Sequence, residues 1–152
     1  MGTRRAPLLS RAFREAVADW MMLLGAVVLV LSLFLVWSHQ FPAPLRGVLA
    51  LRGVPRDPTG WQVYSAADVC LAMVAATLVF VAFLGTRRAR LVALVPVGIA
   101  MAFVVRAMSV PPTNGVGVAF LSNHPTSAAG ETVALIALGL GMAGLALSFT
   151  AD

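Results

Sequence analysis

Four apolar runs without charged side chains divide this sequence and set most of what the chain can fold into. The first and last are Trp20 to Trp37 and Thr132 to Ala151, of 18 and 20 residues. The two between them run from Val69 to Gly85 and from Leu91 to Val105. As a helix, 18 residues extend about 27 Å, which is enough to cross the hydrocarbon core of a bilayer. The runs therefore predict four transmembrane helices.

The overall composition is that of a membrane protein. Hydrophobic residues make up 60% of the chain, charged residues only 11%, and the mean hydropathy is +0.92. A chain with so little polar surface cannot cover a soluble globule. The expected fold class is an all-α membrane protein, a four-transmembrane-helix bundle with a short N-terminal amphipathic helix and small outer loops.

The placement of the arginines sets the expected orientation. All eleven basic residues are arginine, and seven of them lie before the first run or in the turn 86–90. Three more lie in the loop 38–58. Because cytoplasmic loops are enriched in basic residues, we expect both termini on the cytoplasmic side of a bacterial cell membrane. The net charge of +5 does not indicate nucleic acid, since no basic face is interleaved with aromatic residues.

The whole chain, 1–152, is expected to form one membrane domain. Its parts in order are a cytoplasmic amphipathic segment (1–19), a first span (20–37), an outer loop (38–58), a second span (59–85), a cytoplasmic turn (86–90), a third span (91–110), a second outer loop (111–126) and a fourth span (127–151). In the first segment Leu9, Phe13 and Val17 recur at three-to-four-residue spacing, which predicts a helix lying on the membrane surface.

Short strands are expected in both outer loops. In the first loop Leu45-Arg-Gly-Val48 recurs as Leu51-Arg-Gly-Val54. The even offset puts Arg46 and Arg52 on one face of a strand, whereas a helix separates them by about 240°. In the second loop the segment 116–120 follows an Asn-Gly turn signal and is rich in valine.

Three charged residues are expected at a similar depth near the outer end of the bundle. At about 1.5 Å per residue from the cytoplasmic boundary, Arg106 lies roughly 24 Å up, Asp68 roughly 28 Å and Glu131 roughly 31 Å. A carboxylate costs on the order of 2.5–3.5 kcal/mol in mid-bilayer, so a partner nearby is expected. The cluster is interpreted as a structural ion pair, or alternatively as the mouth of a path for a small ion or solute.

Small residues predict the faces on which the helices pack, because they let membrane helices approach closely. On the second span Asp68 shares a face with Ala72, Ala75 and Ala82. On the third span Arg106 shares a face with Gly98 and Ala102. The fourth span carries a helix-packing stripe, which consists of Ala134, Ala137, Gly141, Gly144 and Ser148. We interpret this stripe as packing inside the bundle rather than as a dimer face.

No pattern in the sequence indicates an enzyme, a cofactor or a metal site. Cys70 is the only cysteine, which excludes an intrachain disulfide and a thiolate metal cage, and we expect it to be a small core residue. His39 and His124 both fall in outer loops and lack the spacing of metal ligands. No nucleophile-and-base arrangement and no phosphate-binding glycine loop is present. We therefore expect no catalytic residues, no cofactor-binding residues and no metal ligands.

Several short motifs carry a resemblance to a known group of proteins. They are Trp61-x-x-Tyr-Ser-x-x-Asp68, Arg106 shortly before Pro111-Pro112, a Gly115-Val-Gly-Val run, and a glycine-rich last span. In these features the chain resembles small four-span membrane proteins common in actinobacteria. The resemblance implies topology and host type rather than a chemistry. The chain departs from that group by its long arginine-bearing first outer loop and by the absence of a basic tail after the last span.

Two hypotheses for the function follow. The first is a non-enzymatic multi-pass membrane protein that acts as an accessory or assembly component, with the lipid bilayer as its partner. The second is a small-ion or small-solute channel or carrier with the charge cluster at its mouth. The sequence leaves open whether the chain forms a homo-oligomer or joins a larger membrane complex.

Overall fold

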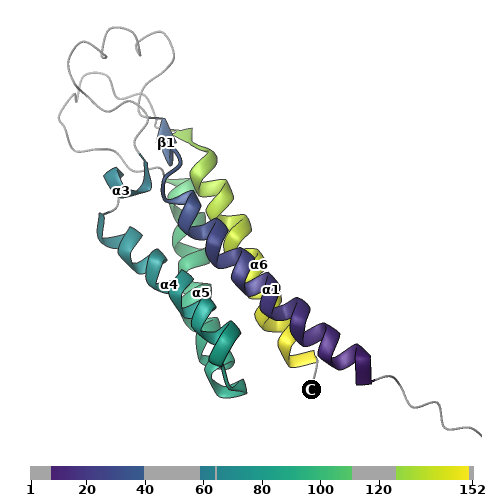
Figure 1. Cartoon of the computed structure of the whole chain (residues 1–152). Helices are drawn as coiled ribbons and strands as arrows, with labels where there is room; N and C mark the ends of the chain where they lie inside the picture. The colour runs from purple at the N-terminus through teal and green to yellow at the C-terminus, as the bar shows by residue number, and fades with distance from the viewer. Residues whose placement is uncertain (1–7, 40–58, 64, 111–125, 151–152) are drawn as a thin grey trace, which may run out of the picture.

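The computed structural model describes residues 8–39, 59–63, 65–110 and 126–150 (Figure 1). Within these residues four helices are long and apolar enough to cross a membrane. They are α1 (Leu8–Ser32), α4 (Ser65–Leu84), α5 (Arg87–Ser109) and α6 (Ala129–Thr150). The expected all-α bundle of four membrane helices is confirmed. A fifth, single-turn helix, α3 (Gly60–Val63), precedes α4.

The helix α1 differs from the expectation at its N-terminal end. The prediction separated an amphipathic surface helix (1–19) from a first span beginning at Trp20. The structure has one unbroken helix from Leu8 to Ser32, and residues 11–32 qualify together as a candidate span. No glycine or proline lies between residues 8 and 24 to interrupt the helix. The described residues therefore contain no separate N-terminal helix.

The connection between α4 and α5 is a tight turn. The Gly85 amide donates to the Val81 carbonyl oxygen at 3.0 Å and ends α4. Thr86 then caps α5, because its hydroxyl oxygen accepts a hydrogen bond from the Ala89 amide at 3.3 Å. The cap starts α5 four residues before the predicted third span, so the arginines of the turn lie in its first helical turn.

The tightest packing in the bundle is between α1 and α6, which run side by side in opposite directions (Figure 1). Glycines make the approach possible. A Cβ added to Gly25 of α1 would lie 2.7 Å from the Ala137 carbonyl oxygen, and one added to Gly144 of α6 would lie 2.8 Å from the Ala18 carbonyl oxygen. The backbones of the two helices thus touch at two levels, which only residues without a side chain allow.

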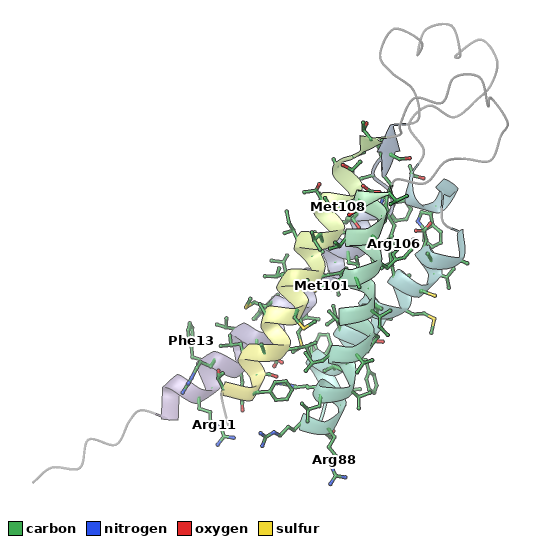
Figure 2. The ribbon with its side chains drawn as sticks, turned by 180° about the vertical axis from the view of Figure 1, so that it is seen from behind. Arg11, Phe13, Arg88, Met101, Arg106 and Met108 are labelled. Carbon is green, nitrogen blue, oxygen red and sulfur yellow. The ribbon has the colours of Figure 1, made fainter. Side chains whose placement is uncertain are left out.

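The core lies between α1, α4, α5 and α6 and is apolar along most of its length. Its largest buried side chains include Met22, Leu29, Leu78 and Leu138. The outer faces of the helices carry large exposed hydrophobic side chains, as Phe13 in Figure 2 illustrates. Apolar surface inside and outside is the pattern of a helix bundle that has lipid as its solvent.

A short antiparallel pairing closes one end of the bundle. Strand β1 (Ser38–His39) pairs with β2 (Thr126–Ser127), with Ser38 opposite Ser127. These strands are not the ones predicted. The segments 45–54 and 116–120, for which strands were expected, lie outside the described residues.

The two ends of the bundle are named here by one residue each. The Trp37 end holds β1, β2 and α3, where α1 finishes and α6 begins. The Arg90 end holds the turn between α4 and α5, and there Arg14 of α1 donates to the Thr150 carbonyl oxygen at 3.1 Å. This bond gives the last carbonyl groups of α6 a cationic partner.

Candidate functional site

The Trp37 end contains two acidic side chains shielded from solvent. Asp68 and Glu131 are both 0% exposed. None of their four carboxyl oxygens has a hydrogen-bond partner among the described residues. The Ala128 amide, near the Glu131 carboxyl, donates instead to the Trp37 carbonyl oxygen at 3.2 Å. Two buried acids without partners are unusual, because a buried polar group normally finds a hydrogen bond.

Trp37 organises the backbone around these acids. Its indole Nε1 donates to the Ser32 carbonyl oxygen at 2.7 Å, so it satisfies a carbonyl group at the end of α1. The ring lies against two glycines. A Cβ on Gly60 would be 3.1 Å from Trp37 Nε1 and 3.3 Å from Asp68 Oδ1, and a Cβ on Gly130 would clash with the ring. The ring therefore lies between α3, next to Asp68, and the first turn of α6, which carries Glu131.

Backbone hydrogen bonds hold the same region together. The Gly130 amide donates to the Val36 carbonyl oxygen at 2.8 Å, and the Ala128 amide donates to the Trp37 carbonyl oxygen. The carbonyl groups that follow α1 thus satisfy the free amides that precede and begin α6. This junction places Glu131 in the first turn of α6, where the helix dipole favours a negative charge.

The third member of the predicted cluster lies toward the same end of the bundle but faces outward. Arg106 is exposed on α5 (Figure 2), and among the described residues it makes no ion pair with Asp68 or Glu131. The expected α5 face was also wrong, since Ala102 is exposed and a Cβ on Gly98 would meet nothing within 4 Å. The buried stripe of α5 consists instead of Ala93, Val97, Ala100, Val104 and Ala107. These residues recur at alternating spacings of four and three, and this period in the sequence indicates the buried face of α5.

The small-residue faces of the other two helices point inward, apart from Ala72 of α4, which is half-buried and lines the α1–α4 groove. Asp68, Ala75 and Ala82 of α4 are buried. All members of the α6 stripe are buried as well: Ala134, Ala137, Gly141, Gly144 and Ser148. Gly141 lies against α4, where a Cβ would be 2.8 Å from Leu78 Cδ1. The α6 stripe therefore contacts α1 and α4 within one chain.

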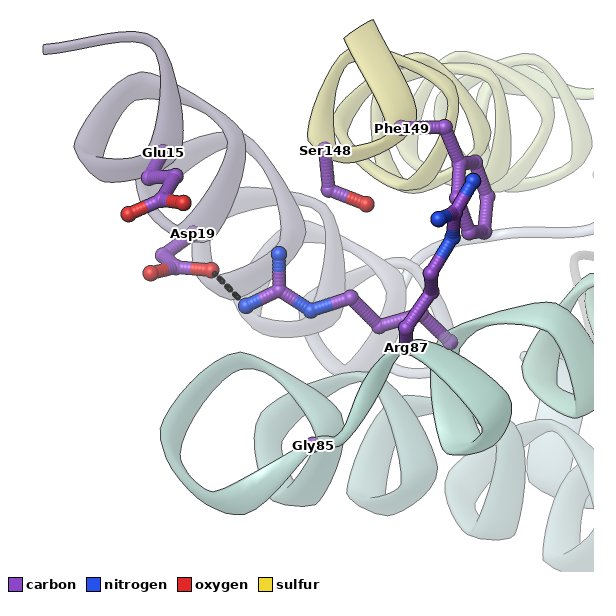
Figure 3. Close-up of a pocket in the computed structure, with 7 residues that line it drawn as sticks. Glu15, Asp19, Gly85, Arg87, Ser148 and Phe149 are labelled. Carbon is purple, nitrogen blue, oxygen red and sulfur yellow. Dashed lines mark hydrogen bonds and ion pairs between the residues drawn. The ribbon is translucent and has the colours of Figure 1, made fainter. Parts of the chain in front are cut away.

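Sequence reasoning missed a second charged site, at the Arg90 end. Arg90 Nη2 of α5 lies 2.9 Å from Asp19 Oδ1 of α1, and the two side chains are 16% and 32% exposed (Figure 3). The pair borders a cavity of about 240 Å³, whose lining also includes Glu15, Arg87 and Ser148. A signal was available, because Asp19 directly precedes one uncharged run and Arg90 directly precedes another.

The remaining candidate residues do not form a reactive centre in the described part of the chain. No group of three or more His, Cys, Asp or Glu side chains there is arranged to hold a metal ion. Cys70 was expected in the core, but it is exposed on α4 and lines an apolar groove between α4 and α5. That groove, of about 330 Å³, has almost entirely apolar walls. His124 lies outside the described residues.

Fold and charge distribution together define the class. The chain is a multi-pass membrane protein whose four apolar helices form a bundle with charged residues confined to its two ends. Comparison with protein-family models, curated proteins and solved structures finds no match.

Proposed function

We propose that this protein is a non-enzymatic accessory or assembly component of a bacterial cell membrane, with both termini in the cytoplasm. The observation that carries the proposal is the sealed interior of the bundle. Between the two ends, the described residues bury only apolar and small side chains, and the buried Ser32 hydroxyl donates to the Leu29 carbonyl oxygen of its own helix at 2.7 Å. A bundle without a polar path is suited to packing against other membrane components rather than to conduction.

The surface of α4 supports the same function. It is flanked by two apolar grooves, one shared with α1 and one shared with α5, and alanine contributes to the walls of both. Grooves lined by small side chains let another membrane component approach the helix backbone closely. Arginine placement and the resemblance to small four-span actinobacterial proteins support the orientation and the host type.

The test of the assembly role is copurification from native membranes under mild detergent, followed by mass spectrometry. We expect one or a few proteins to be retained in fixed stoichiometry, and to be lost with Cys70→Leu, at an exposed position in the α4–α5 groove. The matched control is Ala146→Leu, at an exposed position of α6. A chain that purifies alone from its own membranes, with no fixed partner, contradicts the proposal.

The orientation has its own test. In a Cys70→Ala background, the variant Arg88→Cys has a single cysteine. This cysteine should react with a membrane-impermeant maleimide only after the cells are permeabilised. Labelling in intact cells would put the turn between α4 and α5 outside and overturn the proposed orientation.

A second candidate function, a channel or carrier for a small cation, rests on Asp68 and Glu131. Buried acids without partners attract cations, and such groups within membrane helices often mark ion paths. Liposome flux of the wild type, Asp68→Asn and Arg106→Ala separates the two functions. The accessory role requires no selective flux in any of the three proteins, whereas a carrier requires flux that Asp68→Asn abolishes.

A further inference from the structure

The charged cavity at the Arg90 end and an apolar groove on the outside of the bundle meet at Asp19. Asp19 lines both the cavity of about 240 Å³ and a groove of about 310 Å³ between α1 and α4. The groove is otherwise bordered by apolar side chains, among them Trp20 and Leu23 of α1 and Phe83 of α4. One site therefore has a polar head and an apolar extension.

The apolar extension continues along the same two helix faces. A further groove of about 340 Å³ lies between α1 and α4, and its walls are apolar. On α1 the wall residues of the two grooves include Ala16, Trp20, Leu23, Val27 and Val30. On α4 they include Ala72, Ala76, Val79 and Phe83. Spacings of three and four put each set on one stripe of its helix, so together they form one seam.

The dimensions of this α1–α4 seam match one leaflet of a bilayer. From Ala16 to Val30 the helix rises about 21 Å, and one leaflet with its headgroup region contributes roughly half of a bilayer thickness of about 40–45 Å. The charged cavity lies where the uncharged runs of α1 and α5 begin, which is the depth of lipid headgroups. The seam therefore follows the path of an acyl chain that descends from a headgroup.

The charges in the cavity select the headgroup. Glu15 and Asp19 supply two carboxylates, and Arg87 and Arg90 supply two guanidinium groups. Glu15 also forms an exposed ion pair of 3.6 Å with Arg11, one turn earlier on α1. Figure 3 shows the acids on one wall of the cavity and Arg87 across from them. Arg90 Nη2 is engaged by Asp19, and Arg90 Nε is buried without a partner among the described residues. A phosphate oxygen accepts from guanidinium N–H groups that border the cavity, and a primary ammonium donates to carboxylates.

We propose that the α1–α4 seam binds one phospholipid whose headgroup carries both a phosphate and a primary ammonium, the chemistry of phosphatidylethanolamine. The phosphate accepts from Arg90 and Arg87, and the ammonium donates to Glu15 and Asp19. An anionic headgroup without an amine leaves the carboxylates facing negative charge. A quaternary ammonium has no N–H to donate. The acyl chain lies over Leu23, Val27 and Ala76.

Native mass spectrometry of the full chain tests the proposal. The protein in detergent is mixed with equal amounts of phosphatidylethanolamine, phosphatidylcholine and phosphatidylglycerol of identical acyl chains. We expect the ethanolamine lipid to be bound about tenfold more than either competitor, since one charge-assisted hydrogen bond corresponds to roughly that factor. Equal binding of the three headgroups overturns the proposal.

Three variants locate the site. Glu15→Gln keeps the Asp19–Arg90 pair and should reduce the preference for ethanolamine several-fold; Asp19→Asn should abolish it. Ala76→Leu fills the seam from an exposed position of α4 and should reduce binding of all three lipids, while the matched change Ala146→Leu on α6 should not. If both leucine variants behave alike, the lipid does not occupy the seam. If Ala76→Leu instead dissociates a dimer without changing lipid binding, a second copy covers the seam and the proposal is wrong.

Discussion

Arg90 and Asp19, 71 positions apart in the sequence, form an ion pair of 2.9 Å that joins α5 to α1. The pair gives α5, which packs mainly on α6, a direct polar link to the first helix of the chain. It lies at the Arg90 end, where the side chains are only partly exposed. A charge pair in such surroundings is screened less than one on an open surface.

Removing one member of this pair should destabilise the bundle more than removing both. Asp19→Asn or Arg90→Met leaves a partly buried charge alone, and we expect each to lower the free energy of unfolding by about 1–3 kcal/mol. The double variant should recover part of that loss. A double-mutant cycle from denaturation in detergent measures the coupling. Arg88→Met, at an exposed neighbour, is the control, and additive losses would contradict the pairing.

The close approach of α1 and α6 predicts opposite outcomes for two glycines of the same helix. Gly144→Ala puts a Cβ 2.8 Å from the Ala18 carbonyl oxygen, so the helices must separate, at an expected cost of about 1–3 kcal/mol. Gly139→Ala meets nothing within 4 Å and should be neutral or stabilising by up to about 1 kcal/mol. Thermal unfolding in detergent distinguishes them. Equal effects would mean that α1 and α6 do not meet at Gly144.

Replacing the buried acids at the Trp37 end should not reduce the stability of the protein. Breaking a buried ion pair typically costs about 3–5 kcal/mol. Because no side chain among the described residues pairs with either acid, Asp68→Asn and Glu131→Gln should keep or raise the stability of the protein. Arg106→Gln should have little effect, since this side chain is exposed. A loss of several kcal/mol in Asp68→Asn that Arg106→Gln reproduces would restore the three-residue cluster.

Trp37 should be the most sensitive side chain at its end of the bundle. Trp37→Phe removes the donor to the Ser32 carbonyl oxygen and leaves a void, with an expected cost of about 2–4 kcal/mol. Gly130→Ala drives a methyl group into the same ring and should shift the tryptophan fluorescence spectrum as the ring moves. Thermal unfolding and emission spectra check both changes. An unchanged spectrum in Gly130→Ala would show that the ring does not lie against α6.

Several features could be predicted from particular residues of the sequence. Three of the uncharged runs are long enough to cross a bilayer as helices, and the third, of 15 residues, crosses when it extends past Arg106 to Val110. The small residues of the last run lie on one face because of the helical period. The inward direction of Asp68 followed from the alanines that share its face. The start of α5 could also have been found from Thr86, a favoured cap residue before the arginines.

Other predictions were wrong because the local sequence pattern does not decide which faces of the helices contact one another. Gly98 and Ala102 put two small residues on the face of Arg106, yet α5 packs on its valine and alanine stripe. Small residues permit close approach, but the rotation of a helix depends on the shape of every neighbour at once. The contact between Asp19 and Arg90 likewise depends on how α1 and α5 are rotated.

The sequence by itself determined the class of the protein, the number of membrane helices and the confinement of charge to their ends, because hydrocarbon accepts only long uncharged helices. The tertiary structure alone decided that α1 and α6 touch through Gly25 and Gly144, that Arg106 faces outward, and that Asp19 meets Arg90 beside an apolar seam. Those outcomes depend on how each helix is turned about its own axis. That rotation is set by packing between segments distant in the chain, which no single stretch of sequence records.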